Sequence, residues 1–351
     1  MKKFGFIITS IMIVAIMATA PAMAQKFTCK ISLIHAEDLY KDSGYPTAVV
    51  FKNIVEAQTG GDIKVAIYPN SQLGNETEAM EGLQMGTVQI ACPSAGATTK
   101  FVPEFFALNI PFMFFSHREA WAFYDSTFFA NIMDGVRKAK GIRYIGQTDD
   151  GGGFVCLTNS KKPVKTPADL KDIKMRDLEH EGRLMFWRSL GVSATPIPWE
   201  ELYTALQTGV VDGQSNGVGI ISWAKLWEVQ KYATALGHYY GSLQWFVSEK
   251  WFQSLPEKYQ KVILHAMEEA KWVGRGVVRV KNVTGYDEMT KAGMQVYFPS
   301  DDEKEAFRKI GQPAYMEWVR KKLNNDLVDK SMAEIQKIRT DKFLYSTPSN
   351  Q

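Results

Sequence analysis

A candidate anion-binding group stands at the end of a short apolar stretch in the middle of the chain. The stretch from Ile173 to Arg176 is predicted to be a strand, and small ligands of open α/β sheets bind at the carboxyl edge of the strands. A guanidinium at that edge can hold a carboxylate or a sulfonate through two parallel hydrogen bonds. The alternative is that Arg176 is a structural cation paired with Asp172, Asp177 or Glu179.

Three further side chains follow predicted strands and are candidates for lining a pocket. Trp199 begins a helix directly after Pro196-Ile197-Pro198, where its ring forms either a pocket wall or part of the core. Gln214 and Asn216 carry amides that both donate and accept hydrogen bonds, although their surroundings also suit an Asx-type turn. Taken one at a time, a structural role is at least as plausible as a binding role for each of them.

The sequence contains no motif that indicates catalysis or nucleotide binding. It has no G-x-S-x-G, S-x-x-K, H-E-x-x-H or Walker A pattern, and the run 217–222 lacks the third glycine of a dinucleotide fingerprint. The adjacent residues of Glu179-His180-Glu181 fan out around a helix, so they cannot converge on one metal ion. Gly151-Gly152-Gly153 is interpreted as a flexible crossing, because no Lys, Ser or Thr completes a phosphate site. We therefore predict no cofactor and no metal site.

The composition is that of a folded protein with room for two domains. The chain has 351 residues, 45% of them apolar and 23% charged, which excludes a disordered polymer. With 41 basic and 38 acidic residues, the net charge of +3 is too small to indicate nucleic-acid binding.

The three cysteines lie at positions 29, 92 and 156, without a C-x-x-C pair or a histidine at chelating spacing. Cys29 and Cys92 fall in predicted strands, where a cysteine is usually a small buried hydrophobe. We expect burial, although a disulfide between two of the cysteines is an open alternative in an oxidising compartment.

The N-terminus has the pattern of an export signal. Lys2 and Lys3 precede an apolar run from Phe4 to Ala20, and Ala22-Met23-Ala24 is a small-x-small cleavage site. We expect residues 1–24 to be a cleaved signal peptide and the mature protein to reside in the periplasm. The alternative is an uncleaved anchor helix, since the run is near the lower limit for spanning a bilayer.

The remaining sequence alternates between strand and helix patterns and ends in amphipathic helices at 256–338. This order predicts parallel strands covered by helices, divided into two α/β lobes rather than one large sheet. His117-Arg118-Glu119 is expected to be a solvated helix start. The predicted strands are 27–34, 63–68, 88–92, 142–148, 154–158, 173–176, 194–197, 211–214 and 242–248, and the predicted helices are 47–59, 76–85, 167–171, 182–190 and 200–208.

The run from Pro196 to Gln214, PIPWEELYTALQTGVVDGQ, resembles the signature of the DctP-type solute-binding proteins, which serve tripartite ATP-independent periplasmic (TRAP) transporters. Together with four shorter blocks, the resemblance covers about residues 27–340. The shorter blocks are Pro69-Asn70-Ser71-Gln72-Leu73-Gly74, Val102-Pro103-Glu104, Pro167-Ala168-Asp169-Leu170-Lys171 and Leu226-Trp227-Glu228-Val229-Gln230-Lys231-Tyr232.

The resemblance implies a two-lobed periplasmic binding protein fold with a central ligand cleft, mixed sheets flanked by helices and a helical C-terminal part. Lobe I is expected to comprise residues 25–148 and about 238–272. Lobe II is expected to comprise residues 149–237 and about 273–351, including the C-terminal helices.

The resemblance to the DctP-type proteins also implies which residues bind the ligand. An arginine at the position of Arg176 grips the acid group of the ligand in this family, and the pocket aromatic falls on Trp199. The expected ligand-binding residues are Arg176, Asn216, Trp199, His35, Ser94, Gln214 and Glu179.

Two departures from the family pattern bear on the ligand. Many members have a second arginine on the strand after the glycine crossing, where this chain has Gly153-Phe154-Val155-Cys156, and Ser215 replaces a commonly acidic residue. Both favour a small organic monoanion, a monocarboxylate or a sulfonate. The implied partners are the small and large membrane permease subunits of a TRAP transporter.

Two other classes of function are weighed against transport. One is an exported ligand-sensing domain, and the other is a cleft enzyme that uses His35, Glu37 or Asp38 as acid–base groups. Because no activated nucleophile or metal set accompanies those residues, we expect that the protein is not an enzyme.

Overall fold

The computed structural model describes residues 26–323 and 326–341. The predicted signal peptide, residues 1–24, lies outside these ranges. Within them, none of the helices combines the length and the apolar character that crossing a membrane requires.

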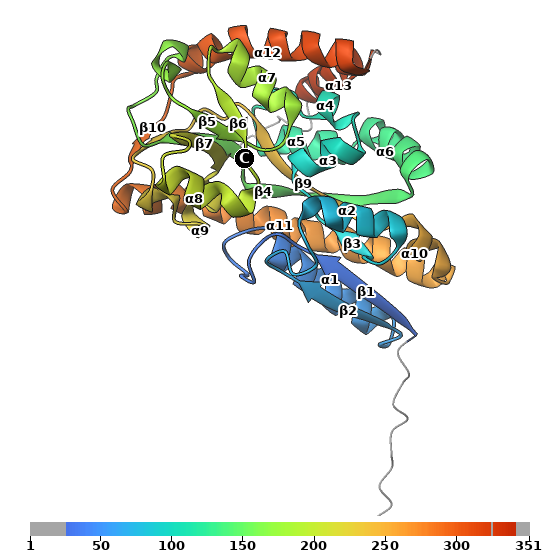
Figure 1. Ribbon diagram of the computed structural model, residues 1–351. Coiled ribbons are helices and arrows are strands. Elements are labelled where there is room, and N and C mark those ends of the chain that lie inside the picture. The colour runs from blue at the N-terminus through green and yellow to red at the C-terminus, as the bar shows by residue number, and fades with distance from the viewer. Residues whose placement is uncertain (1–25, 324–325, 342–351) are drawn as a thin grey trace, which may run out of the picture.

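One end of the structure is a parallel α/β unit (Figure 1). It contains the strands β1 (Phe27–Ser32), β2 (Ile63–Tyr68) and β3 (Ile90–Ala91), with helices α1 (Gly44–Gln58) and α2 (Glu76–Met85) between them. β1 pairs in parallel with both β2 and β3, as the alternation of strands and helices predicts. The bounds of α2 match the prediction, because the Asn75 side chain caps its first turn and Gly86, with a φ of +82°, ends it.

A second parallel unit contains the candidate arginine. Its elements are β5 (Met175–Asp177), α7 (Glu181–Ser189), β6 (Ala194–Pro196), a 3₁₀ turn (Trp199–Glu201), α8 (Leu202–Gln207) and β7 (Gly213–Gly217). β5 pairs in parallel with β6 on one side and with β7 on the other. Arg176 is the middle residue of β5, one position from the carboxyl end that the sequence predicted.

Two long strands join these units. β4 (Ile142–Asn159) pairs antiparallel with β9 (Tyr240–Ser248) along its first half and with β7 along its second half. β8 (Tyr232–Thr234) also pairs with the second half of β4, and β10 (Gln295–Tyr297) pairs with β8. The strand order is therefore β2-β1-β3-β9-β4-β7-β5-β6. The sheet is mixed, and both halves of the structure share β4.

The prediction of separate strands at 142–148 and 154–158 is wrong, because β4 continues through the residues between them. The pairing of β4 with β9 shifts register between Asp149 and Phe154, which is how a bulged strand accommodates extra residues. The local pattern of Asp and Gly at 149–153 indicates a turn between two strands. The pairing of these residues depends instead on the register of β9, which is distant in the sequence. The interpretation of the glycines as a crossing between the two halves agrees with this course of the chain.

The three glycines at 151–153 are required by their backbone conformation and by their neighbours. Their φ angles are +53°, +128° and +77°, a region that side chains disfavour. A Cβ atom on Gly153 would lie 2.9 Å from Cε2 of Tyr240 and 3.0 Å from Nε2 of His117. Other residue types at this position would therefore displace a packed ring.

The C-terminal part is mostly helical, as predicted, with the addition of β10. Its helices are α10 (Glu249–Ser254), α11 (Glu257–Lys291), α12 (Asp301–Leu323) and α13 (Leu327–Thr340). The 35 residues of α11 extend over about 52 Å. α11 crosses the middle of the molecule in Figure 1 and packs against α1, β4 and α9 (Val218–Trp223), so it contacts both halves.

The remaining helices cover the sheet near β9. They are α3 (Ala95–Phe101), α4 (Phe105–Leu108), α5 (His117–Tyr124) and α6 (Thr127–Lys140). Side chains of β9 alternate between two cores: Trp245 and Val247 join the core beneath α1 and α11, whereas Phe246 joins the core that contains α4, α5 and α6. The sheet is therefore buried on both faces at this point.

The prediction that His117 lies in a solvated helix start is wrong. Helix α5 begins at His117, but the imidazole ring is buried against β4. Its Nε2 lies 3.0 Å from the carbonyl oxygen of Gly152, and its Nδ1 lies 2.8 Å from Nη1 of Arg279 on α11. The short motif could not reveal this burial, because the covering groups come from distant segments.

All three cysteines, Cys29, Cys92 and Cys156, are buried and free, so the expected burial is confirmed. Burial raises the pKa of each thiol above its usual value. They are therefore unreactive packing groups in this structure, and the alternative of a disulfide is not realised.

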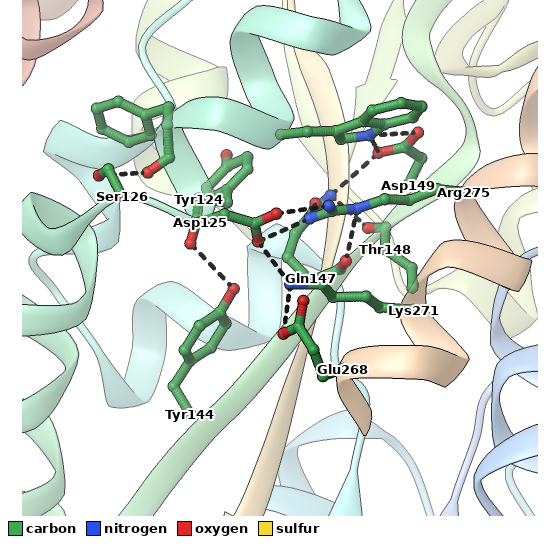
Figure 2. A network of polar contacts seen from close by, with 12 residues as sticks. Tyr124, Asp125, Ser126, Tyr144, Gln147, Thr148, Asp149, Glu268, Lys271 and Arg275 are labelled. Carbon is green, nitrogen blue, oxygen red and sulfur yellow. Dashed lines mark hydrogen bonds and ion pairs between the residues drawn. The ribbon is translucent and has the colours of Figure 1, made fainter. Parts of the chain in front are cut away.

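A network of ion pairs and hydrogen bonds around the buried Arg275 fixes α11 to β4 (Figure 2). Nη1 and Nη2 of Arg275 donate to the two carboxylate oxygens of Asp125 at 2.7 and 3.0 Å. Nε and Nη2 of the same guanidinium reach the backbone and side-chain oxygens of Gln147 at 3.2 and 3.0 Å. Lys271 adds contacts of 3.2 Å to Asp125 and 2.8 Å to Glu268.

Candidate functional site

Two adjoining cavities lie between the two halves of the structure. The cleft cavity has a volume of about 600 Å³, and the inner cavity has a volume of about 20 Å³. They adjoin because Glu76, Ser94, Leu178 and Trp199 belong to the walls of both. The other residues around the inner cavity are Ile34, His35, Asp150, Asn216, Ile220 and Trp223.

Arg176 lies in the wall of the cleft cavity and has hydrogen-bonding capacity to spare. Its side chain is completely buried, and its Nε donates a hydrogen bond of 2.9 Å to the carbonyl oxygen of Ile197. Within the described part of the chain, Nη1 and Nη2 have no hydrogen-bond partner. Burial lowers the pKa of this guanidinium to about 10, an effect that the charge of Asp177 only partly offsets. A buried cation without partners is costly, and an anion in the cavity would relieve that cost.

The structural alternatives for Arg176 are not realised among the described residues. Asp177 accepts a hydrogen bond of 2.6 Å from the Trp187 indole and lies 3.4 Å from Arg183. Glu179 pairs with Lys100 at 2.6 Å at the rim of the cleft cavity. Each of these carboxylates is therefore engaged elsewhere.

A cavity of similar volume, about 620 Å³, is a weaker candidate for anion binding. It lies beside Phe112, Phe114 and Phe154, away from β5, and its arginine is Arg308. That guanidinium already donates to Glu305 at 2.7 Å, so it is neutralised in place. The two cavities have similar volumes, but they differ in their arginines. The terminal nitrogens of Arg176 have no partner among the described residues, whereas Arg308 is bound to Glu305.

The apolar wall of the site is formed by two stacked indoles. Trp199 lies on Trp223 with the ring centres 5.3 Å apart and the planes 20° from parallel. Trp199 is at the start of the 3₁₀ turn after β6, and Trp223 ends α9. The predicted wall position of Trp199 agrees with its place in both cavities.

Asn216 lies on the inner cavity, and Gln214 lies behind it. Nδ2 of Asn216 donates a hydrogen bond of 2.5 Å to Oε1 of Gln214. Nε2 of Gln214 in turn donates a bond of 2.7 Å to Oγ1 of Thr158 on β4. Gln214, which was predicted to contact the ligand, therefore holds the orientation of Asn216 and is not among the residues of either cavity wall.

His35 follows β1 and faces two carboxylates. Its Nε2 lies 3.5 Å from Oδ2 of Asp42 and 3.5 Å from Oδ1 of Asp150. Burial alone would lower the pKa of His35, but the two carboxylates outweigh it and raise the pKa to about 9. Burial raises the pKa of Asp42, and the charge of His35 offsets this in part. His35 was predicted to lie in the cleft, and the structure places it in the wall of the inner cavity.

Ser94 follows β3 and is bound to Glu76, the first residue of α2. The backbone N–H of Ser94 donates to one carboxylate oxygen of Glu76, and its Oγ donates to the other at 3.0 Å. Burial raises the pKa of Glu76, an effect that the hydrogen bonds from Ser94 oppose. The carboxylate of Glu76 therefore belongs to the walls of both cavities, beside Ser94, which was predicted to bind the ligand.

Three residues of the site, Glu76, Asp42 and Asp150, were not predicted. In the sequence, Glu76 is only the first residue of the predicted helix 76–85. Asp150 directly precedes Gly151-Gly152-Gly153, a run that indicates a backbone crossing and not a binding carboxylate. Because Asp42 and Asp150 are more than 100 positions apart, only the fold brings them to one histidine.

The acid–base groups of the enzyme hypothesis do not assemble. Glu37 accepts a hydrogen bond of 2.8 Å from the hydroxyl of Tyr45 at the surface. Asp38 accepts one of 2.8 Å from the backbone N–H of Tyr40. Neither belongs to the walls of the two cavities that contain Arg176 and His35.

Two α/β halves share β4, and between them lie a cavity and a guanidinium whose terminal nitrogens lack partners in residues 26–323 and 326–341; these features define a two-lobed solute-binding protein. The chain belongs to the bacterial extracellular solute-binding protein family 7, whose model matches residues 40–322. The resemblance drawn from the sequence motifs is thereby confirmed, as is the expectation that the protein is not an enzyme, since members of this family are transport binding proteins.

Three known proteins illustrate the similarity. The C4-dicarboxylate-binding periplasmic protein of Rhodobacter capsulatus is 29% identical over 85% of this chain and 88% of its own. The structure of a TRAP periplasmic solute-binding protein from Polaromonas bound to D-erythronate has a TM-score of 0.82 and 30% identity, covering 90% of this chain and 100% of that chain. A TRAP periplasmic protein from Bordetella, with density assigned to pantoate, has a TM-score of 0.79 and 33% identity, covering 87% and 98%.

Proposed function

We propose that the protein is the periplasmic solute-binding subunit of a TRAP transporter and that it captures a small organic monoanion, a monocarboxylate or a sulfonate. The observation that carries this proposal is the completely buried Arg176, whose two terminal nitrogens lack partners among the described residues beside a cavity of about 600 Å³. The planar fork of a guanidinium matches two oxygens of a carboxylate or a sulfonate.

The charges around the site favour one negative charge on the ligand over two. Glu76 belongs to both cavities, so a second acid group on the ligand would face its carboxylate. The strand position at which many family members have a second arginine is Gly153-Phe154 here. Hydroxyl groups, in contrast, can donate to Glu76 and Asp150. The ligands of the Polaromonas and Bordetella relatives, D-erythronate and pantoate, are hydroxylated monocarboxylates.

The affinity expected for such a ligand can be accounted for by few contacts. A micromolar dissociation constant corresponds to about 8 kcal/mol. Hydrogen bonds to a charged group contribute roughly 1.5–3 kcal/mol each, and Arg176 offers two. Burial of the ligand against Trp199 and the amide of Asn216 would supply the remainder.

Ligand capture would proceed by closure of two lobes. We place lobe I at residues 25–148 and about 238–272, and lobe II at 149–237 and about 273–351. The register shift of β4 after Asp149 supports this boundary. Closure can be driven only by contacts that the ligand makes with both lobes. The closed, loaded protein would then deliver the anion to the small and large permease subunits in the membrane.

A thermal-shift screen followed by calorimetry tests the proposal. The probes are D-erythronate, pantoate, propanesulfonate and succinate, with wild-type protein, Arg176→Ala and the exposed control Arg188→Ala on α7. A ligand at 100 times its Kd adds about 2.7 kcal/mol of stability, which is readily seen as a rise in Tm. We expect a monoanion to stabilise wild type and Arg188→Ala, but not Arg176→Ala. Unchanged affinity in a folded Arg176→Ala variant would refute the site, and preference for succinate would refute the monoanion class.

A further inference from the structure

We propose that His35, Asp42 and Asp150 form a binding site for one divalent transition-metal ion, of which zinc is the best match, at the inner end of the cleft. His35 Nε2 is 3.5 Å from one oxygen of each carboxylate, and one ligand atom from each of the three residues lies within 4.8 Å of the others. A tetrahedral ion with bonds of about 2.1 Å holds its ligand atoms about 3.4 Å apart. The two separations from His35 Nε2 therefore match those of a zinc ligand set, and the two carboxylate oxygens lie within 4.8 Å of each other.

The two carboxylate oxygens that face His35 are buried and lack hydrogen bonds among the described residues. Oδ2 of Asp42 and Oδ1 of Asp150 have no hydrogen-bond partner among the described residues. The exposed fraction is 2% for the His35 side chain and 5% for that of Asp42. Buried carboxylate oxygens are normally satisfied, and a cation between them would satisfy both at once.

The distances argue against a simple ion pair. A protonated histidine that bridges two carboxylates forms charge-assisted hydrogen bonds of about 2.7–2.9 Å. Both separations from His35 Nε2 are 3.5 Å, longer than such bonds. The space between the three groups is therefore wider than a shared proton requires.

The surrounding chain holds the carboxylate of Asp42 in position. Its other oxygen, Oδ1, accepts a hydrogen bond of 2.5 Å from the backbone N–H of Gly44. The next residue, Ser43, donates a bond of 2.6 Å from Oγ to the carbonyl oxygen of Asp149. This ties the loop after β1 to the strand that bears Asp150. Such hydrogen-bond support of a ligating carboxylate is typical of metal sites, whereas Nδ1 of His35 has no hydrogen-bond partner among the described residues.

The set of donor atoms indicates the kind of metal. One imidazole nitrogen and two carboxylate oxygens suit zinc and its transition-metal neighbours, whereas calcium and magnesium require six or more oxygens. Three protein ligands leave a fourth position open, and His35 and Asp150 both line the inner cavity. An oxygen of the transported anion could occupy that position, a consequence that rests on the proposed function.

Titration calorimetry with zinc chloride tests the site on tag-free protein stripped with a chelator. We expect one ion per chain for wild type, and at least 100-fold weaker binding for His35→Gln and for Asp42→Asn. The control is His265→Gln, which removes an exposed histidine that pairs with Glu269 on α11. Cobalt added in place of zinc should give the visible absorption of a four-coordinate ion in wild type and not in His35→Gln.

Three outcomes would overturn the proposal: no zinc binding by wild type, equal binding by His35→Gln, or loss of binding in His265→Gln. Circular dichroism checks that each variant is folded. Because His35→Gln and Asp42→Asn each remove one metal ligand, either of them tests the site if the other does not fold. The test is independent of the transported anion, because it needs no ligand. If D-erythronate binds equally well with and without zinc, the metal does not contact the anion, whereas failure of the proposed function would appear as loss of all anion binding.

Discussion

Nε of Arg176 donates a hydrogen bond of 2.9 Å to the carbonyl oxygen of Ile197, and this one contact decides which way the guanidinium faces. It links β5 to the segment after β6, and the two terminal nitrogens, which have no partner in the described part of the chain, belong to a residue of the cavity wall. A planar group anchored at one edge presents its opposite edge in a fixed direction. The site is thus organised for an anion by a backbone carbonyl that side-chain substitution cannot remove.

Replacement of Arg176 by lysine is expected to weaken anion binding at least 10-fold. A lysine keeps the charge, but it has a single nitrogen and cannot both bond Ile197 and present two parallel donors. A factor of 10 corresponds to about 1.4 kcal/mol, less than one charge-assisted hydrogen bond. Calorimetry with the strongest binder of the thermal-shift screen measures the change, and Arg188→Lys on the exposed face of α7 is the matched control. Equal affinity in Arg176→Lys would mean that charge alone holds the ligand.

Replacement of Gln214 by leucine is expected to lower both stability and ligand affinity without removing a cavity residue. The change eliminates the bonds to Thr158 and Asn216. The Thr158 hydroxyl keeps its bond of 2.9 Å to Gln230, but the buried amide of Asn216 loses its acceptor. The free energy of unfolding should fall by about 1–3 kcal/mol, and the affinity should fall several-fold because the Asn216 amide is no longer oriented. Urea unfolding and calorimetry measure the two effects. The exposed Gln207→Leu on α8 should alter neither, and wild-type affinity in Gln214→Leu would show that Asn216 needs no support.

Replacement of Gly153 by alanine is expected to destabilise the protein by more than about 2 kcal/mol. The φ of +77° costs a side chain about 1–2 kcal/mol, and the new methyl group would press on Tyr240 and His117. Gly135→Ala is the contrasting control, because a methyl group there meets no atom within 4 Å and the position lies inside α6. That control should be neutral or stabilising by up to about 1 kcal/mol. Denaturant unfolding of the two variants side by side gives the comparison, and equal stability would refute the strain at β4.

Asp125 makes stability depend on pH in the acid range. Burial alone would raise the pKa of this carboxyl, but the hydrogen bonds and charges of Arg275 and Lys271 lower it below its usual value. A lowered folded-state pKa contributes stability that is present above the pKa of the unfolded chain, near 4, and is lost as the pH falls through the folded-state pKa.

Asp125→Asn should therefore cost about 3 kcal/mol at pH 7, because it leaves buried Arg275 without its carboxylate, and should cost progressively less below pH 4. Urea unfolding at pH 7, 5 and 3.5 measures the difference. The surface pair partner Asp134→Asn should show no comparable pH-dependent difference. A cost for Asp125→Asn that is constant across this range would contradict the assignment.

Local sequence was enough to predict those parts of the fold that local interactions determine. The cap at Asn75 and the stop at Gly86 fix both ends of α2 within a few residues, so its bounds could be predicted. The position of Arg176 near the end of a buried strand likewise follows from a short apolar stretch. Neither depends on the distant parts of the chain.

Features that depend on distant partners could not be predicted in this way. The continuity of β4 depends on its register with β9, about 100 residues away, and the burial of His117 depends on Arg279 and the crossing strand. The same holds for Asp42 and Asp150 beside His35, which only the folded chain brings together. The sequence therefore identified individual side chains of the cleft but not their mutual contacts.

The sharing of β4 and α11 by both halves has a consequence for folding. Each half lacks part of its sheet or its covering helix unless the whole chain is present, and Arg275 binds the two shared elements to each other. Neither half is then an autonomous folding unit, so heat should melt the molecule in a single calorimetric transition. Fragments that each contain one half should remain unstructured when they are expressed separately.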